Sequence, residues 1–520
     1  MKGSDILVAA LKNEGVDRIF GVPGEENLGV LESLRRAGVD FVVTRHEQPA
    51  AFMAATYGRL TGKPGVALST LGPGALNLAT GAAYAHLGGM PMVLITGQKA
   101  IRQGRQARFQ IVDVVAAMRP LTKQSHQITS AASIPTLVRD AFRVAAEERP
   151  GPVHLELPED IAAEQTGEAP LVPVHAIDLP VPSDAAIARA AALILSARCP
   201  LLMFGAGANR PHLAQALAAF VRRVRLPFFN TQMGKGAVGG ASDLSVGTAA
   251  LSERDYVHRA IDRADLIIAI GHETVEKPPF LMDRGEPQVI HVGFTAATVE
   301  QVYFPQAEVI GDIAKGLALL AERLEGKLKV DTGWKAVRSE ILKHIADRAA
   351  EDRCPLTPQR IVHDVRLVMP PDGIVTLDNA LATMGAGLPS AMMAALLYPD
   401  RRVLTVAGDG GFMMNSQELE TALRLRLNLV VLIIEDYAYG MIRWKQETDG
   451  FADWGLRFNN PDFVAYAVAY GATGRRIGAA AELVPALQRA FAAGGVHLIA
   501  VPIDYSENVR VLVEELRHMQ

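Results

Sequence analysis

Short apolar runs alternate with longer helical stretches along the whole chain. The strand-like runs are rich in β-branched residues and end at turn or charged residues, as in "VDFVVTR", "ADLIIAIG", "RRVLTVAG" and "LNLVVLIIED". Between them lie Ala- and Leu-rich stretches with helical spacing, such as "SIPTLVRDAFRVAAEE" and "DAAIARAAALILSA". Continuous apolar strands separated by helices are typical of parallel sheets covered by helices on both faces. The pattern therefore predicts an α/β fold built from doubly wound parallel sheets.

Two breaks interrupt this alternation. Residues 164–183 contain four prolines and no sustained period, which is typical of an extended linker. From about residue 325 to residue 358 the sequence becomes charged and helical, and it ends in a proline-containing segment. A chain of 520 residues also exceeds the usual domain size of roughly 100 to 200 residues. We predict three α/β domains, at 1–165, 183–325 and 355–520.

Charge and cysteine content exclude several classes of protein. The net charge of −4 and the isoelectric point near 6.4 disfavour nucleic acid as a partner. Cys199 and Cys354 match neither a metal-ligand spacing nor a disulfide framework, which favours a reducing, cytoplasmic setting. The N-terminus indicates a helix followed by a strand rather than a signal peptide. No apolar run approaches the ~20 residues of a membrane span, so we expect a soluble protein.

The segment "VLTVAGDGGFMM" places Asp409 among glycines directly after a predicted strand. Functional groups of a parallel sheet gather at the carboxyl ends of its strands, and glycine-rich loops there bind phosphate. Asn415 and Glu418 have the spacing of a capping box, which predicts that a helix starts after Asn415. An acidic side chain beside phosphate-binding amides is explained if Mg²⁺ lies between them, because Mg²⁺ binds carboxylates together with phosphate oxygens.

The next predicted strand supplies candidates for a second metal ligand. "VVLIIEDYAYG" ends in Glu435 and Asp436, and twenty-five residues separate Gly410 from Asp436. Taken alone, Asp409 or Asp436 would more often be an ordinary acid at a strand end or turn. The pair, separated by one helix and one strand, predicts a magnesium site at the edge of the sheet.

This spacing, a Gly-Asp-Gly followed by about 25 residues and an Asn or Asp, resembles the thiamine diphosphate enzymes, and the resemblance extends over nearly the whole chain. It implies that Asp409, Asp436 and the backbone carbonyl of Ala438 hold Mg²⁺. It also implies cofactor contacts from both loops around the metal, through Gly408, Gly410, Gly411, Tyr439, Gly440 and Met441.

The segments "VVTRHEQPAAFMAATYGRL" and "LGPGALN" resemble the part of this family that binds the pyrimidine ring of the cofactor. The resemblance implies that Glu47 hydrogen-bonds this ring and promotes deprotonation of the thiazolium, with Gly72, Gly74 and Asn77 beside it. On its own, Glu47 would more often be a solvated charge. Met384 corresponds to the apolar residue that supports the bent cofactor, although packing at a helix start explains it equally well. Because this site lies between subunits in the family, we expect a homodimer or homotetramer.

Further segments, including "VPGEENLGVL", "RFQIVDVVAAMRPLTKQSHQI" and "VPIDYSENVRVL", are similar to acetolactate synthase large subunits. The resemblance implies condensation of two pyruvate molecules to 2-acetolactate with loss of CO₂, the cofactor serving as electron sink. It places Gln110 and Phe109 at the reacting carbon and Lys123 nearby, although Lys123 is equally explained as a surface residue. The Arg-Phe-Asp-Asp-Arg element of the flavin-dependent members is missing, and Asp436 replaces their Asn, as in the catabolic members. We therefore expect no FAD.

The chain departs from this family after "GIVTLDN". About two dozen residues normally precede the "TMGAGLP" element, whereas here only a short junction, 379–383, leads to it. Three alternatives stay open. One is another thiamine diphosphate-dependent 2-oxoacid decarboxylase or carboligase, and one is an oxidoreductase that uses the Gly205–Gly207 loop for a dinucleotide. The third is a non-catalytic relative, which the short junction favours.

Overall fold

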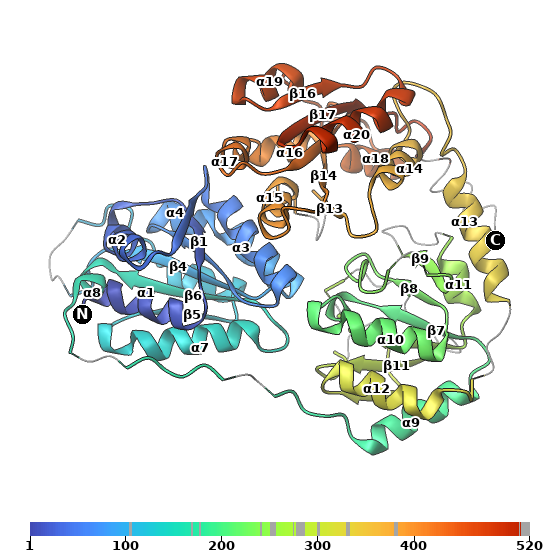
Figure 1. Cartoon of the computed structure of the whole chain (residues 1–520), viewed down its shortest axis with the longest axis horizontal. Coiled ribbons are helices and arrows are strands. Elements are labelled where there is room, and N and C mark those ends of the chain that lie inside the picture. The colour runs from blue at the N-terminus through green and yellow to red at the C-terminus, as the bar shows by residue number, and fades with distance from the viewer. Residues whose placement is uncertain are drawn as a thin grey trace. The chain divides into compact units, whose positions relative to one another are not determined.

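The computed structural model of the chain contains three parallel sheets, each with helices around it (Figure 1). The described residues are 1–102, 107–167, 170–175, 178–239, 242–249, 256–273, 275–276, 287–298, 302–328, 333–378, 383–508 and 510. Contacts divide the chain into two compact units. The first holds residues 1–176, 352–356 and 364–503, and the second holds residues 177–351, 357–363 and 504–520. The predicted fold class, doubly wound parallel sheets, is confirmed, and the three domain boundaries remain predictions.

The first sheet has the strand order β2-β1-β3-β4-β6-β5. Its strands are β1 (Arg18–Gly21), β2 (Asp40–Val43), β3 (Gly65–Ser69), β4 (Met92–Gln98), β5 (Gln124–Gln127) and β6 (Pro152–Pro158). Its helices are α1 (Gly3–Asn13), α2 (Leu28–Ala37), α3 (Glu47–Thr61), α4 (Gly72–Asn77), α5 (Ala79–Gly88), α6 (Val114–Met118), α7 (Ile134–Ala146) and α8 (Glu159–Ala163). Both β4 and β6 are buried along their whole length, as expected for strands covered on both faces. Helices α1, α2, α7 and α8 share one apolar cluster with this sheet, and α3 and α5 belong to another.

The second unit contains a sheet with the order β12-β11-β10-β7-β8-β9. Its strands are β7 (Pro200–Phe204), β8 (Phe228–Asn230), β9 (Ser245–Thr248), β10 (Leu266–Ile270), β11 (Gln288–Gly293) and β12 (Ala307–Ile310). Its helices are α9 (Asp184–Ser196), α10 (Ala214–Val224), α11 (His258–Arg263), α12 (Ile313–Leu324) and α13 (Trp334–Ala346). The strand order changes direction between β7 and β10: β7, β8 and β9 follow one another toward one edge of the sheet, and β10, β11 and β12 toward the other. Ligands of such a sheet would bind at the carboxyl ends of β7 and β10.

The third sheet has the order β13-β14-β15-β17-β16. Its strands are β13 (Ile374–Leu377), β14 (Val403–Gly408), β15 (Leu429–Glu435), β16 (Thr473–Arg476) and β17 (Val496–Pro502). Its helices are α14 (Pro358–Val368), α15 (Gly387–Leu397), α16 (Asp409–Asn415), α17 (Glu418–Arg424), α18 (Gly440–Thr448), α19 (Phe463–Tyr470) and α20 (Leu483–Ala493). Strand β13 lies at the edge of this sheet, and its Val375 and Leu377 are 43% and 47% exposed. An apolar edge strand of this kind is unusual in a parallel sheet, whose strands are normally covered.

The predicted capping box after the Gly-Asp-Gly-Gly loop is wrong. The first helix begins at Asp409 and ends at Asn415, and the second begins only at Glu418. Asn415 does not cap a helix, because its side-chain amide donates to the carbonyl of Gly385 at 2.9 Å and to Gln48 Oε1 at 3.2 Å. Both residues of the pattern have polar side chains that bind distant segments, and these tertiary contacts replace the local capping bonds.

The first and third sheets share one apolar core inside the first unit. Helix α3 packs on α15, where the hydroxyl of Thr56 donates to that of Ser390 at 2.9 Å. Glu418 adds a second link, since it is fully buried and its Oε1 accepts the backbone N–H of Arg45 at 2.9 Å. Its Oε2 accepts the hydroxyl of Thr421, and burial raises the pKa of Glu418 to about 7.

Replacing Glu418 by alanine should lower the free energy of unfolding by about 1–3 kcal/mol, because the Arg45 N–H and the Thr421 hydroxyl lose their acceptor. Denaturant unfolding of the two proteins measures this difference. Glu420→Ala, on the same helix but paired with Arg424 at the surface, is the matched control and should change stability little. An equal loss in both variants would contradict the assigned link.

Candidate active site

Asp409 joins the carboxyl ends of two neighbouring strands. It is the first residue of α16 and is almost completely buried. Its Oδ2 accepts the backbone N–H groups of Asp436, at 3.2 Å, and Tyr437, at 2.8 Å, and the amide of Asn460 at 2.7 Å. Its Oδ1 accepts the N–H of Gly410 at 2.8 Å. The start of α16 and the loop after β15 are therefore held together through one carboxylate, and Asn460 is a partner for which the sequence carried no signal.

The two acids at the end of β15 have different surroundings. Glu435 is buried and accepts hydrogen bonds from Arg476, at 2.5 Å from Nη1 and 2.9 Å from Nη2. Asp436 Oδ2 is buried without a hydrogen-bond partner among the described residues, and Arg443 Nη2 lies 3.7 Å from it. Burial and the nearby charge of Asp409 raise the pKa of Asp436 to about 6. Glu435 is thus occupied by an arginine, whereas Asp436 keeps an oxygen for a ligand.

The unpartnered Oδ2 of Asp436 would suit a divalent cation, whereas both oxygens of Asp409 already accept N–H groups of the chain. After burial, the charge of Asp409 is the second cause of the raised pKa of Asp436, and a cation would reverse this effect. In the described part of the chain, no cluster of three or more His, Cys, Asp or Glu side chains forms a complete metal site. Further ligands would have to come from backbone carbonyls such as that of Ala438, from phosphate and from water, which is the mixed ligand set typical of Mg²⁺.

The glycines of this loop allow close approach of neighbouring groups. A Cβ atom on Gly410 would lie 2.9 Å from the Tyr439 ring, and one on Gly411 would lie 1.6 Å from Asp378 Oδ2. A Cβ on Gly408 would meet no described atom within 4 Å. The first turn of α16 is therefore packed against Asp378 and Tyr439, whereas Gly408 at the end of β14 is open.

Glu47 lies at the carboxyl edge of the first sheet, as the first residue of α3, and is 8% exposed. Its Oε2 accepts the amide of Asn77 at 3.0 Å, and a Cβ atom on Gly74 would lie 3.1 Å from its Oε1. Gly72 has a φ of +49°, and a Cβ there would lie 2.2 Å from the carbonyl oxygen of Gln110. The structure thus brings Glu47, both glycines, Asn77 and the backbone of Gln110 together.

The Phe109–Gln110 segment is exposed beside this group. Phe109 is 70% exposed, which is unusual for a large apolar side chain. Gln110 has a φ of +58°, in the left-handed region that residues other than glycine rarely adopt. Such backbone conformations cluster at ligand-binding sites, where other contacts hold them.

Lys123 does not join this group. It precedes β5, at the amino edge of the sheet, while Glu47 and Gly72 lie at the carboxyl edge. Its ammonium donates to the carbonyls of Val144 and, at 2.9 Å, Glu147, at the C-terminal end of α7. A lysine that binds the last carbonyls of a helix has a structural explanation, and this position at the amino edge argues against the predicted catalytic role of Lys123.

Met384 and the short junction lie before α15. Met384 is half-buried in a turn that ends where α15 begins, next to Gly385 with a φ of +85°. Residues 379–382 of the junction lie outside the described residues. The support of the cofactor by Met384 remains a prediction.

A buried polar network that was not among the predicted site residues lies beside Gly74, which also neighbours Glu47. Glu26, which is 7% exposed, accepts the ammonium of Lys99 at 2.6 Å and the hydroxyl of Thr70. A Cβ on Gly74 would lie 2.9 Å from Thr70 Cγ2, so the same Thr70 packs behind the glycine that touches Glu47. Glu26 and Lys99 follow β1 and β4 at the carboxyl edge, where position alone would have made them candidates.

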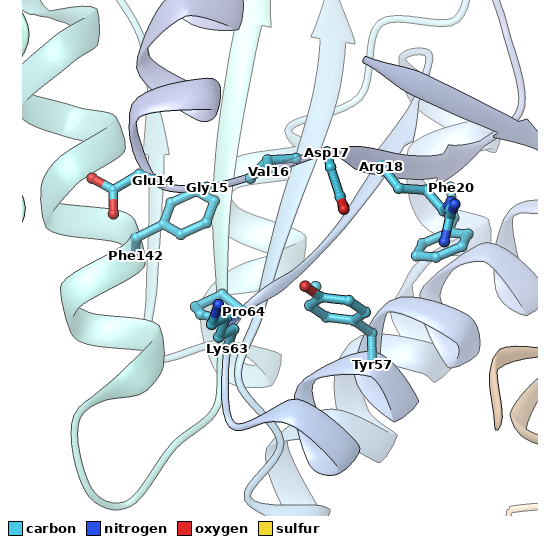
Figure 2. A pocket seen from close by; sticks show the side chains of 11 residues that line it. Glu14, Gly15, Val16, Asp17, Arg18, Phe20, Tyr57, Lys63, Pro64 and Phe142 are labelled. Carbon is cyan, nitrogen blue, oxygen red and sulfur yellow. The ribbon is translucent and has the colours of Figure 1, made fainter. Parts of the chain in front are cut away.

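A pocket at the opposite, amino edge of the first sheet contains none of these residues (Figure 2). Figure 2 shows Val16 and Asp17 on one wall and Tyr57, Lys63 and Pro64 on the other. Because the predicted site residues other than Lys123 lie at the carboxyl edges of the first and third sheets, and Lys123 does not line this pocket, the pocket has no part in the candidate site.

Family models match in all three parts of the chain. The N-terminal TPP-binding domain of thiamine pyrophosphate enzymes matches residues 1–117, their central domain residues 187–320 and their C-terminal TPP-binding domain residues 357–501. Glu47 falls in the first match, and Asp409 and Asp436 fall in the third.

Curated relatives match over nearly the full length. The chain is 33% identical to the acetolactate synthase of Bacillus subtilis (strain 168), over 99% of this chain and 95% of the relative. It is 33% identical to the catabolic acetolactate synthase of Raoultella terrigena, over 97% and 96%. It is 31% identical to the large subunit of acetolactate synthase isozyme 2 of Escherichia coli (strain K12), over 99% and 97%. The Bacillus alignment spans 545 positions against 520 residues here, so at least 25 of its positions have no counterpart in this chain. The chain belongs to the thiamine pyrophosphate enzymes and is a thiamine pyrophosphate-dependent enzyme.

Proposed function

We propose that this enzyme condenses two pyruvate molecules to 2-acetolactate with release of CO₂, using thiamine diphosphate and Mg²⁺. The observation that carries the proposal is the full-length similarity to acetolactate synthases, together with the pair Asp409 and Asp436 at the ends of adjacent strands. The cofactor, when bound, supplies a nucleophilic carbon and an electron sink for decarboxylation.

The residues of the chain would bind and orient the cofactor. Asp409, Asp436 and the carbonyl of Ala438 would hold Mg²⁺, which in turn would bind the diphosphate over Gly408, Gly410 and Gly411. The adjoining residues Tyr439, Gly440 and Met441 would complete this half of the cofactor site. Gly408 ends β14, and the other positions follow β14 or β15, all at the carboxyl edge.

Glu47 would act on the other end of the cofactor. Its carboxyl group would hydrogen-bond the pyrimidine ring and exchange a proton with a ring nitrogen, which would favour the imino tautomer of the ring's amino group, while Gly72, Gly74 and Asn77 border the ring. The Asn77 amide, 3.0 Å from Glu47 Oε2, fixes the orientation of this carboxylate. Met384 would support the cofactor between its two ends, and Phe109 and Gln110 would face the substrate.

The active site would lie at the interface of a homodimer or homotetramer. Within the described residues of one chain, no hydrogen bond or ion pair joins Glu47 to Asp409. Large apolar side chains are exposed beside both groups: Leu28, Leu76 and Phe109 near the first, and Tyr437, Met441, Ile442 and Trp454 near the second. Exposed apolar groups in this number favour burial by a second copy of the chain.

We propose further that the second unit takes no FAD. In a sheet of this topology a dinucleotide binds at the carboxyl ends of β7 and β10. There the carboxylate of Glu276 accepts the N–H of Ala206 at 2.7 Å and the hydroxyl of Thr231, and the N–H of Gly207 binds the carbonyl of Gly271 at 2.7 Å. These N–H and hydroxyl groups are thus already hydrogen-bonded within the chain and are not available to a dinucleotide. Stoichiometric yellow flavin in the purified enzyme would refute this part of the proposal.

A pyruvate assay for acetolactate, with and without thiamine diphosphate and Mg²⁺, tests the function. Formation of acetolactate that requires both additions is the expected result. Acetaldehyde as the main product would indicate a simple decarboxylase instead, and binding of the cofactor without turnover of pyruvate would refute the proposed reaction.

Asp436→Asn should still bind Mg²⁺ and the cofactor, because an amide oxygen can replace one carboxylate oxygen as a ligand. The pH dependence of the Mg²⁺ affinity should differ between this variant and the wild type. In the wild type, Mg²⁺ affinity should fall as the pH drops through about 6, because the raised pKa of Asp436 lets a proton displace the metal there. Calorimetric titration with Mg²⁺ at saturating thiamine diphosphate, from pH 7.5 to 5.5, measures both. A variant with the same decline as the wild type would contradict the role of Asp436.

A further inference from the structure

Asp378 is a buried carboxylate between two segments of the candidate cofactor site. It follows β13 directly, is 7% exposed, and its backbone N–H binds the carbonyl of Val406 on β14 at 3.2 Å. Its Oδ1 accepts the N–H groups of Gly385, at 2.8 Å, and Gly387, at 3.0 Å. One oxygen therefore fixes the turn that contains Met384 and leads into α15.

The second oxygen of Asp378 lies against the Gly-Asp-Gly-Gly loop. A Cβ atom on Gly411 would lie 1.6 Å from Oδ2 and 2.8 Å from Cγ, so only a glycine leaves room for this carboxylate. The turn at Gly385 is also tied to the end of α16, because Asn415 donates to the Gly385 carbonyl at 2.9 Å. Asp378 thus contacts both segments that the family resemblance assigns to the cofactor.

No basic side chain among the described residues pairs with Asp378. Burial raises its pKa to about 6, and only the two amides of the turn oppose this effect. Two neutral groups lie close to it: Thr405, whose Oγ1 would lie 2.9 Å from a Cβ on Gly387, and Tyr84, whose pKa is raised mainly by burial and is also influenced by the charges of Arg59 and Asp378. Within the described residues, the ionised carboxylate therefore contributes a negative charge without an ion-pair partner beside the start of α16, which is expected to receive an anion.

We propose that Asp378 is a positioning residue with two opposed effects: it holds the Gly385–Gly387 turn against the Gly411 backbone, and its negative charge weakens binding of the diphosphate at that loop. The inference rests on the proposed cofactor site. It also explains how the turn before α15 is anchored although the junction that precedes it is short, since the two hydrogen bonds to Asp378 reach across that junction.

Two substitutions separate the two effects. Asp378→Asn keeps an oxygen that accepts both amides but removes the charge, whereas Asp378→Ala removes both. At pH 7.5 and saturating Mg²⁺, Asp378→Asn should bind thiamine diphosphate at least about threefold more tightly than the wild type by calorimetric titration, because a like charge near the diphosphate is lost. Asp378→Ala should bind it more weakly, and its cofactor-free form should melt at a lower temperature than that of Asp378→Asn.

Asp400→Asn is the matched control, because Asp400 is exposed at the turn before β14, at the opposite edge of the same sheet. It removes the same charge and should leave the affinity for thiamine diphosphate unchanged. Unchanged or weaker binding in Asp378→Asn, in a protein whose wild type binds the cofactor, would overturn this inference alone. Equal melting temperatures of the two Asp378 variants would overturn the positioning role. A wild type that does not bind thiamine diphosphate would overturn the proposed function and this inference with it.

Discussion

Asp409→Ala should abolish detectable binding of thiamine diphosphate and Mg²⁺, a loss of at least about 100-fold in affinity. The substitution removes a proposed metal ligand, and it also removes the acceptor that holds the N–H groups of Asp436 and Tyr437 and the Asn460 amide. The loop after β15 would lose its connection to the start of α16, so the second proposed ligand would be displaced together with the first. Calorimetric titration with the cofactor at saturating Mg²⁺ measures the effect.

The control for this prediction is the neighbouring acid. Asp436→Asn should retain binding, because the backbone contacts to Asp409 do not involve the Asp436 side chain. Thermal melting of the cofactor-free proteins excludes a general loss of structure in Asp409→Ala. An equal loss of binding in both variants would count against the assignment of Asp409 as the residue that organises the site.

Glu47→Gln should reduce acetolactate formation at least about 100-fold while thiamine diphosphate still binds, since proton transfer by a positioned side chain contributes roughly 10²–10⁴-fold to catalysis. Glutamine keeps the shape of the side chain and can still meet the Asn77 amide, but it cannot exchange a proton with the pyrimidine ring. Steady-state turnover of pyruvate at saturating cofactor, combined with a calorimetric measurement of cofactor affinity, separates the chemical defect from a binding defect.

Glu32→Gln provides the comparison for Glu47. Glu32 lies at the surface of α2 and pairs with Arg35, so its substitution should leave turnover unchanged. Full activity of Glu47→Gln would contradict the proton-transfer role and would favour a reading of Glu47 as a structural partner of Asn77.

The hydrophobic pattern was sufficient for the fold class, because continuous apolar strands between helices can be buried only in sheets covered on both faces. It failed where a polar side chain binds far along the chain. Asn415 and Glu418 have the spacing of a local capping box, but they bind Gly385 and Arg45, and spacing alone does not reveal such distant partners. Capping rules consider only the backbone groups next to a helix end, whereas these two side chains form hydrogen bonds with groups that the tertiary fold brings close.

The residues of the candidate site were likewise only partly predictable from the sequence. The sequence placed two acids at the end of β15 and could not separate them, because only the structure shows Arg476 bound to Glu435. The position of Glu47 followed from a family resemblance rather than from its residue type. No sequence pattern distinguishes Asp378, because an acid after an apolar strand is ordinary, and its contacts come from Gly385 and Gly411, which lie later in the chain.

The contact between α3 and α15 sets an order of events during synthesis. Thr56 and Ser390 are 334 residues apart, so at about 5–20 residues per second a ribosome adds the second roughly 15–70 s after the first. During that interval the alanine-rich face of α3, with Ala51, Ala54 and Ala55 fully buried in the finished protein, lacks its partner helix. A nascent chain of this enzyme must therefore carry an incomplete N-terminal core until its last third emerges, and fragments that stop before residue 387 should depend on chaperones to stay in solution.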